Sequence, residues 1–300
     1  MNLKQQFNEH VVEPFIAEYR NARTPIPCVQ CNGTLKFDTL VSRGHAFDAS
    51  HVATGHYARV STITDLNGQQ QYRLHRGVDR QKDQSYYLFT LNQQQLAQAS
   101  FPVGDLSKAE VRDYAHTLGL TTVADKPDSQ DICFVPNGDY ASVIKKYTPE
   151  SFKKGDILDT KGNVIGKHDG IINFTIGQRK GIGISHEEPL YVVNIIAKEN
   201  KVIVGNREAL FIKKIYLKDI NLLSNIQNHK DNLFIKVRST GRLIKAKITM
   251  NKTEAEVNLC EDEIGISPGQ ACVFYSINKF GDKVLGGGWI TRTINKYLST

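Results

Sequence analysis

The sequence has no run approaching about 18 consecutive apolar residues, and its first residues, Met1 to Glu9, lack the apolar core of a signal peptide. We therefore expect neither a membrane span nor export, and we predict a cytoplasmic protein whose thiols stay reduced. Cysteine is scarce and odd in number, five in 300 residues, which argues against a structural disulfide framework. The sequence must therefore be searched for reactive or metal-binding thiols.

Charge is distributed unevenly along the chain. Residues 1–150 carry 15 lysines and arginines against 16 acidic residues, whereas residues 151–300 carry 23 against 15. A basic half of this kind suits a polyanionic partner such as nucleic acid. Lysines that only solvate a surface would give the same count, so the charge alone leaves both interpretations open.

The first half of the chain favours helices. Leu3, Phe7, Val11 and Phe15 recur every four residues and predict an amphipathic helix, which Pro14 should kink or restart. Residues 33–44 predict another short helix. Residues 51–56 resemble a short buried strand that runs into a glycine turn.

A further helix is marked at its start by a capping box. In this motif the Ser107 hydroxyl and the Glu110 carboxylate each accept a hydrogen bond from a free amide of the first turn. Gly119 provides the stop signal at the other end. The residues predicted to form the apolar face of this helix are Val111, Tyr114, Ala115 and Leu118.

The pattern changes near residue 148, where alternation of period two and glycine turns begin to dominate. Residues 160–163 predict a hairpin turn, and 190–196 with 201–205 predict a strand pair. The close spacing of the later strands favours a small antiparallel barrel or sandwich. These later strands are expected at 213–218, 233–239, 243–250, 253–259, 271–277 and 283–290.

Cys28 and Cys31 form a C-x-x-C motif, which is typical of a redox dithiol, half of a metal site or an activated nucleophile. The two thiols could equally be incidental. A paired zinc site would need a second C-x-x-C or a closely spaced histidine pair, and the sequence has neither, so we predict no metal site of this kind. Two prolines precede the motif, which disfavours a thioredoxin-like domain.

Cys133 lies between Ile132 and Phe134, a setting more typical of packing than of chemistry. Its interest depends on a possible partner thiol at Cys31. Two thiols from distant segments can pass a sulfur atom if one carries a persulfide and the other resolves it as a disulfide. Such a relay requires a lowered thiol pKa and the close approach that a disulfide needs.

The loop that contains Lys82, Asp83 and Gln84 combines a cation, an amide and the two aromatic residues that follow it. Such a set suits nucleic-acid phosphates and bases, although an ordinary solvated loop has the same composition.

Taken together, these segments resemble the tRNA-specific 2-thiouridylase family over nearly the whole chain. The segments that carry the resemblance are T-P-I-P-C-V-Q-C-N (24–32), A-T-G-H-Y-A-R (53–59), L-H-R-G-V-D-R-Q-K-D-Q-S-Y-Y-L (74–88), D-S-Q-D-I-C-F (128–134), F-T-I-G-Q-R-K-G-I-G-I (174–184), S-P-G-Q-A-C-V-F-Y (267–275) and L-G-G-G-W-I (285–290).

The resemblance implies an enzyme, a tRNA-uridine 2-sulfurtransferase. ATP, used with magnesium, would adenylate the wobble uridine of certain tRNAs, and a cysteine persulfide would then deliver sulfur to C2. A separate protein would donate the persulfide. By motif, Cys133 matches the persulfide carrier and Cys31 its partner in a transient disulfide. Gly55 matches a residue of the ATP site. The residues that match tRNA contacts are Ile26, Pro27 and Cys28 at the target base, together with Lys82, Asp83, Gln84, Arg238 and Ser239.

The implied fold is α/β plus β. It comprises a truncated adenine-nucleotide α-hydrolase-like (PP-loop) domain with a helical tRNA-contacting part at 1–147, a small β-rich central domain at 148–207, and a C-terminal antiparallel β-barrel at 208–300 that binds tRNA. We predict truncation because the family's S-G-G-x-D-S loop, which cradles the ATP phosphates, occurs nowhere in the sequence.

The resemblance leaves three alternatives open. The chain could be completed by a separate fragment that carries the pyrophosphate loop. It could be a tRNA-binding remnant without ATP-dependent activity, which would still bind tRNA in a salt-dependent way. It could also transfer sulfur through an iron–sulfur cluster held by Cys28, Cys31 and Cys133, since thiolates with an open iron site are chemically suited to that task.

Overall fold

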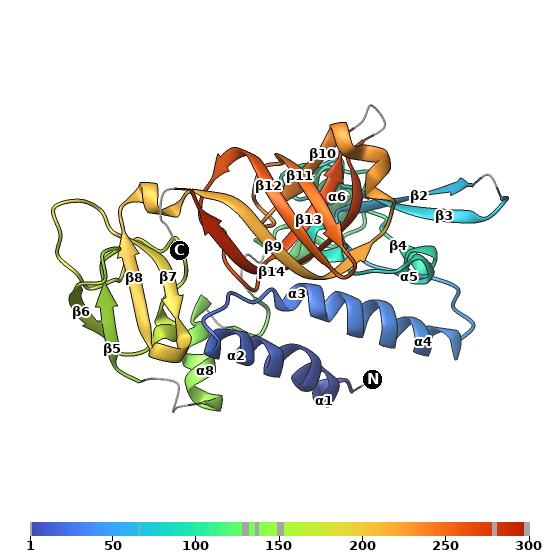
Figure 1. The fold of residues 1–300 in the computed structure, drawn as a ribbon. Coiled ribbons are helices and arrows are strands. Elements are labelled where there is room, and N and C mark those ends of the chain that lie inside the picture. Colours follow the sequence, from blue (N-terminus) through green and yellow to red (C-terminus); the bar gives the residue numbers. More distant parts are fainter. Residues whose placement is uncertain are drawn as a thin grey trace.

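The computed structural model describes residues 2–65, 67–127, 132–135, 138–148, 153–277 and 281–296. Its strands form three sheets, of two, four and eight strands (Figure 1). Within the described ranges, no helix is both long and apolar enough to cross a membrane.

A continuous N-terminal helix begins at Lys4 and ends at Arg20. It consists of α1 (Lys4–Phe7), a π-helical segment η1 (Asn8–Val12) and α2 (Glu13–Arg20). Pro14 lies in the first turn of α2, so the change from π to α form occurs where we predicted a kink. Phe15 on the predicted apolar face is buried in a core shared with the central sheet.

A second continuous helix spans the C-x-x-C motif. It comprises α3 (Pro27–Gln30), a nine-residue π-helical segment η2 (Cys31–Thr39) and α4 (Leu40–His45). The wide turn of η2 is visible in its hydrogen bonding, because the amide of Leu40 donates to the carbonyl of Leu35, five residues earlier. The helix predicted at 33–44 is therefore confirmed, but it begins six residues earlier, at Pro27.

The remaining elements of this half are β1 (Val52–Ala53), β2 (Ala58–Thr64), β3 (Gln70–Arg76), η3 (Ser85–Leu88), α5 (Gln93–Gln98), β4 (Ala99–Ser100), α6 (Lys108–Thr117), α7 (Thr121–Ala124) and α8 (Tyr140–Tyr147). β1 pairs in parallel with β4. The strand predicted at 51–56 is present, but it has only two residues and Ala53 is exposed, so its predicted burial is wrong.

The capping box at the start of α6 is confirmed. The amide of Glu110 donates to the Ser107 hydroxyl at 3.2 Å, and the amide of Ser107 donates to the Glu110 carboxylate at 2.7 Å. The predicted apolar face is wrong as a core element, because α6 has no buried residue and Tyr114 and Leu118 are 59% and 73% exposed. Helical periodicity identified the helix correctly but could not tell which side is covered.

The central sheet has the order β6-β5-β8-β7. Its strands are β5 (Gly155–Leu158), β6 (Val164–His168), β7 (Tyr191–Ile196) and β8 (Lys201–Gly205). Short 3₁₀ segments η6 (Ile171–Asn173), η7 (Ala197–Glu199) and η8 (Arg207–Leu210) lie among them. The hairpin turn predicted at 160–163 and the predicted pairing of the later two strands are both confirmed.

The C-terminal strands form a closed antiparallel barrel, as the sequence predicted. They are β9 (Ile212–Leu222), β10 (Leu233–Lys236), β11 (Ile244–Asn251), β12 (Glu254–Glu263), β13 (Ala271–Ser276) and β14 (Lys283–Asn295), with η9 (Ile226–Asn232) between β9 and β10. Their order is β13-β10-β11-β12-β9-β14, and pairing of β13 with β14 closes the ring (Figure 1). The interior is filled by apolar side chains such as Ile215, Ile235 and Val257.

The first half of the chain packs against both later parts. β14 pairs with β3, so the β2–β3 hairpin extends the barrel sheet. Tyr86 and Phe89 share a buried core with Val273 of the barrel, while α2 shares a core with the central sheet. The domain boundaries predicted at 147/148 and 207/208 stay predictions. The packing matters because it brings the loop after β3 next to the loop after β10.

Candidate active site

A cavity of about 720 Å³ lies where the two N-terminal helices, the loop after β3 and the barrel meet. Cys28, Cys31 and Cys133 all line it. The other lining residues are Phe7, Val11, Pro25, Ile26, Pro27, Asn32, Lys36, His56, Gln84, Tyr86, Tyr87, Ile132, Phe134, Arg238, Ser239 and Gln270. The fold thus brings together thiols that are more than a hundred residues apart in sequence, as a sulfur relay requires. Residues 128–131 of the motif that precedes Cys133 lie outside the described residues.

The C-x-x-C motif opens a helix. Pro27 occupies the first turn of α3, where its missing amide hydrogen is no loss, and Cys28 and Cys31 follow within about one turn. A loop, not a strand, precedes this helix, in agreement with the argument against a thioredoxin-like domain. Because the amino-terminal end of a helix carries partial positive charge, this position favours a thiolate.

Burial in the cavity wall outweighs that effect, and the pKa values of Cys28 and Cys31 are both raised. Desolvation raises the pKa of Cys28, although the residue as a whole is exposed, and the nearby Cys133 and Cys31 raise it further. Desolvation also raises the pKa of Cys31, while Lys36 lowers it and Cys133 raises it. The influence of Cys133 on both Cys28 and Cys31 agrees with the common position of the three residues in the cavity.

The residues expected at the target base lie together on the cavity wall. Ile26 and Pro27 are buried and Cys28 is exposed, and all three line the cavity. Arg238 and Ser239 line it from the turn after β10. The Arg238 guanidinium donates to the Glu263 carboxylate, so its charge is compensated.

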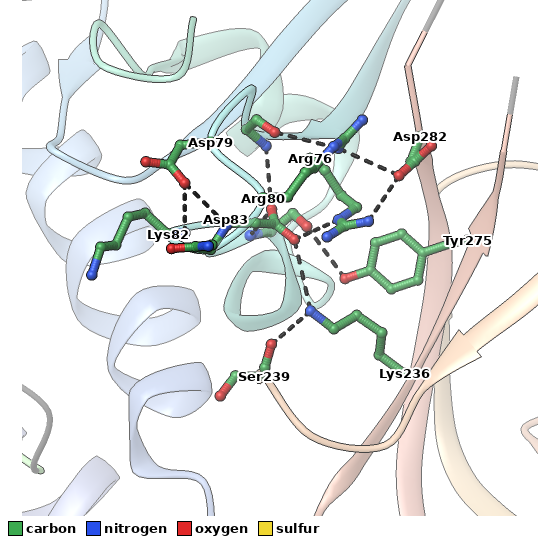
Figure 2. Close-up of polar contacts among 12 residues, drawn as sticks. Arg76, Asp79, Arg80, Lys82, Asp83, Lys236, Ser239, Tyr275 and Asp282 are labelled. Atoms are coloured by element: carbon green, nitrogen blue, oxygen red, sulfur yellow. Dashed lines mark hydrogen bonds and ion pairs between the residues drawn. The ribbon is translucent and has the colours of Figure 1, made fainter. Parts of the chain in front are cut away.

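The three residues predicted as a tRNA-contacting segment point in different directions. Gln84 lines the cavity, and its side-chain oxygen accepts a hydrogen bond from the Tyr57 amide at 3.1 Å. Figure 2 shows Lys82 extending away from the buried polar groups around Asp83. The Asp83 side chain is only 1% exposed and does not line the cavity.

Asp83 is the centre of a buried polar network (Figure 2). Its carboxylate accepts from Arg76 Nε at 2.7 Å and lies 3.8 Å from Lys236 Nζ. Arg76 also donates to Asp282 at 2.8 Å. The network therefore satisfies the buried charges by pairing them, as burial requires.

Lys236 connects this network to the barrel turn that lines the cavity. Its ammonium, 3% exposed, donates to the Ser239 carbonyl at 2.6 Å (Figure 2). Desolvation lowers the pKa of Lys236, and the charge of Asp83 opposes that shift. The two predicted tRNA-contacting segments, 82–84 and 238–239, are thus joined through the Asp83–Lys236 pair.

A second, smaller pocket of about 430 Å³ adjoins the cavity at Lys36, His56 and Gln84. It also contains Gly55, which follows β1, and a β-carbon built at Gly55 would meet no atom within 4 Å. Ligands of α/β folds bind at the carboxyl ends of parallel strands, and β1 belongs to the parallel pair. An open glycine beside a cation at such an edge fits a nucleotide.

Sequence reasoning missed Lys36, His56 and Gln270, which also line the cavity. Desolvation and the charge of Lys36 lower the pKa of His56 to about 4, so its imidazole is neutral at pH 7. His56 stands next to the predicted Gly55, which was an available signal. Lys36 lies five residues after Cys31, a spacing that aligns the two side chains only in a π-helix. The sequence did not reveal the π-helix, so this spacing gave no usable signal.

Among the described residues, no group of three or more histidine, cysteine or acidic side chains has an arrangement that could hold a metal ion. The iron–sulfur alternative through Cys28, Cys31 and Cys133 therefore gains no support from the geometry.

Three family models match the chain consecutively. They are described as a tRNA methyl transferase HUP domain (residues 1–137), a tRNA methyl transferase PRC-barrel domain (141–206) and an aminomethyltransferase beta-barrel domain (212–290). The expectation that the first domain is truncated is not supported, because the HUP-domain model matches from residue 1 to residue 137. The HUP domain corresponds to the predicted nucleotide-binding part.

Curated relatives match almost the whole chain. A tRNA-specific 2-thiouridylase MnmA of Rickettsia felis is 45% identical over 297 residues, which are 98% of this chain and 79% of the relative. The protein of the same name from Rickettsia conorii is 44% identical over 98% of this chain and 78% of its own length. That of Rickettsia prowazekii is 44% identical over 98% of this chain and 80% of its own length.

Proposed function

Because the chain belongs to the tRNA-specific 2-thiouridylase family, we propose that it transfers sulfur from a cysteine persulfide to C2 of the wobble uridine of tRNA. One observation carries the proposal: Cys28, Cys31 and Cys133 line a single cavity although they come from distant segments. The chain then acts as a tRNA-uridine 2-sulfurtransferase.

The sulfur transfer proceeds in two balanced steps. First, the terminal sulfur of a Cys133 persulfide attacks C2 of the adenylated uridine, a carbon–sulfur bond forms, and AMP leaves with the electron pair of the broken carbon–oxygen bond. Second, the Cys31 thiolate attacks Sγ of Cys133. A Cys31–Cys133 disulfide forms, and the electron pair of the broken sulfur–sulfur bond stays on the transferred sulfur as 2-thiouridine. A thiol reductant then restores both cysteines.

ATP supplies the leaving group by adenylating the uridine oxygen. Gly55 with its open β-carbon direction, and Lys36 at the border of the cavity, support binding of the nucleotide in the smaller pocket. Since the S-G-G-x-D-S motif does not occur in the sequence, ATP dependence must be tested separately from sulfur transfer.

We assign the tRNA contacts by their access to the cavity. Ile26, Pro27 and Cys28 form the cavity wall at the extruded base. A flipped base needs a close-fitting pocket, and this wall shields it from water. Gln84, Arg238 and Ser239 face the same space, and Lys82 extends outward on the same loop. Asp83 supports this surface from inside through Lys236 and is not a contact itself. The basic second half of the chain supports phosphate binding.

The test is a thiolation assay with the purified chain, unmodified tRNA, ATP with magnesium and a persulfide-donor protein. We expect mass spectrometry to detect 2-thiouridine and a parallel assay to detect AMP. Cys31→Ser and Cys133→Ser should each abolish the product yet change tRNA affinity by no more than a factor of a few, about 1 kcal/mol. Cys260→Ser is the matched control, because Cys260 is also exposed but does not line the cavity.

Two results would count against the proposal. Loss of tRNA affinity in both cavity variants would indicate that these thiols support structure, not sulfur transfer. The second candidate function is a tRNA-binding protein without catalytic activity, and the missing S-G-G-x-D-S motif favours it. Salt-dependent tRNA binding without AMP release or thiolation, even with a pyrophosphate-loop fragment added, would support that candidate.

A further inference from the structure

Lys36 borders the proposed nucleotide pocket, but neither sulfur-transfer step uses its ammonium. It lines both the thiol cavity and the Gly55 pocket, and it lies on the same helical segment, η2, as Cys31. We propose that Lys36 is a positioning residue that acts through Cys31, its ammonium stabilising the thiolate that resolves the sulfur transfer. The role of this thiolate in sulfur transfer rests on the proposed function, but the effect of Lys36 on Cys31 can be tested without tRNA or ATP.

The form of the helix places the two side chains on one side. In an α-helix each residue adds about 100°, so residues five apart point about 140° away from each other. The π-helix bonds residues five apart, so the same two positions fall on successive turns of one face. Because η2 runs from Cys31 to Thr39, the whole interval from Cys31 to Lys36 has this wide turn. Short π-helical segments are often found at functional sites.

Charges around Cys31 single out Lys36 among the described residues. Desolvation raises the pKa of Cys31 and Cys133 adds to the rise, whereas Lys36 is the cation that lowers it. His56 also lines the cavity but is neutral at pH 7, since its pKa is lowered to about 4. Arg238 faces the cavity as well, but its guanidinium is paired with Glu263. Lys36 therefore supplies the cation that a buried thiolate needs.

The position of Lys36 also suits the order of the reaction. The resolving thiolate is needed only after the persulfide sulfur has bonded to the uridine, and a fixed cation favours the ionised thiol without forming a covalent bond. Lys36 also borders the pocket of the proposed nucleotide, so its ammonium lies near the site where the phosphates of ATP bind and AMP departs.

The experiment measures how alkylation of Cys31 by iodoacetamide depends on pH, in the reduced full chain without tRNA or ATP. Peptide mass spectrometry reports Cys31 in a Cys28→Ser background, because both cysteines fall in one tryptic peptide and Cys28 does not contribute to the pKa shift of Cys31. The variants are Lys36→Met, which removes the charge at similar length, and Lys36→Arg, which retains it. Arg238→Gln removes the other cavity cation as a matched control.

We expect Lys36→Met to move the alkylation midpoint of Cys31 upward by about half a pH unit or more, so that about threefold less thiolate is present at pH 8. Lys36→Arg should retain the original midpoint, and Arg238→Gln should not shift it. In urea-unfolded chains the Met and Lys forms should agree to within a small fraction of a unit, because the helix that aligns the residues is lost.

An unchanged midpoint in folded Lys36→Met, or an equal shift in Arg238→Gln, would overturn the inference. Circular dichroism establishes that each variant is folded, and Lys36→Gln replaces Lys36→Met if the latter is not. The proposed function could fail in the thiolation assay while this titration succeeds, and the reverse is equally possible, so the two failures are distinguishable.

Discussion

Cys272 and Cys31 show how differently two regions of this protein treat the same side chain. Cys272 lies on β13 inside the barrel, fully buried among apolar residues, and desolvation raises its pKa far above the ordinary value. Cys31 lies half-buried at the start of a π-helix, on the wall of a cavity and near Lys36. The comparison indicates that the surroundings, and not the thiol, decide between packing and chemistry.

The difference extends to the polar groups of the two regions. At the edge of the barrel, Asp83 and Lys236 are buried and Asp83 also pairs with the half-buried Arg76, which fixes the loop and the turn that they join. In the cavity, Cys28 and Cys133 are exposed, and Lys36 lines the wall and lowers the pKa values of Cys28, Cys31 and His56. The paired charges hold the barrel edge in a fixed geometry, whereas the cavity leaves its thiols accessible to a substrate.

The largest expected effect comes from breaking the network that joins the two regions. Asp83→Ala leaves Arg76 and Lys236 without their common carboxylate, and removing one partner of a buried pair costs about 3–5 kcal/mol. Urea unfolding should register this loss in the free energy of unfolding. Asp105→Ala is the matched control, because its carboxylate is 77% exposed and only approaches Arg59 at 3.7 Å, so its loss should be below about 1 kcal/mol. Equal losses would mean that the buried network contributes no more than a surface pair.

An intermediate effect is expected when the cavity is acidified. The pKa of His56 is about 4 in the folded chain and about 6.5 when exposed, so the unfolded chain binds this proton first. The corresponding stability, about 3 kcal/mol, is complete above pH 6.5 and is lost as the pH falls through 4. Urea unfolding at several pH values should show a weaker pH dependence in His56→Asn than in the parent chain. The same dependence in both would contradict the burial of a neutral imidazole.

The smallest effect sharpens the comparison of the two thiols. Cys272→Ala removes one buried sulfur from the barrel core and should lower the free energy of unfolding by about 1–2 kcal/mol, with thiolation preserved. Cys31→Ala should do the opposite, abolishing thiolation with a smaller change in stability, because its surroundings are open. Thermal unfolding together with the thiolation assay distinguishes these outcomes. A loss of activity in folded Cys272→Ala would remove the contrast between the regions.

The sequence predicted the parts of the fold that depend on local pattern. Alternation of period two identified the barrel strands, and Ser107 with Glu110 marked a helix start that the structure confirms. The exposure of Leu118 was not predictable, because periodicity shows that a face is apolar but not what covers it. The truncation expected from a missing loop motif was likewise not supported once the HUP-domain match was known.

The candidate site was predictable only through its motifs. Their resemblance to a family named Cys31 and Cys133, but the cavity that both residues line depends on packing between segments that no local pattern connects. Asp83 illustrates the limit, because its motif suggested a contact with tRNA whereas its burial depends on Arg76 and Lys236 from other strands. Lys36 was missed because propensities do not distinguish a π-helix from an α-helix.

The wide turn of η2 has a consequence for insertions and deletions. Five residues in a π-helix and four in an α-helix both return to nearly the same side of the axis. Removing one residue between Cys31 and Lys36, Gly33 for example, together with conversion of the segment to an α-helix would keep the thiol and the amine aligned. Conversion to an α-helix without a deletion would leave the two residues five apart and rotate them about 140° from each other. An engineer who regularises this helix must therefore also shorten it.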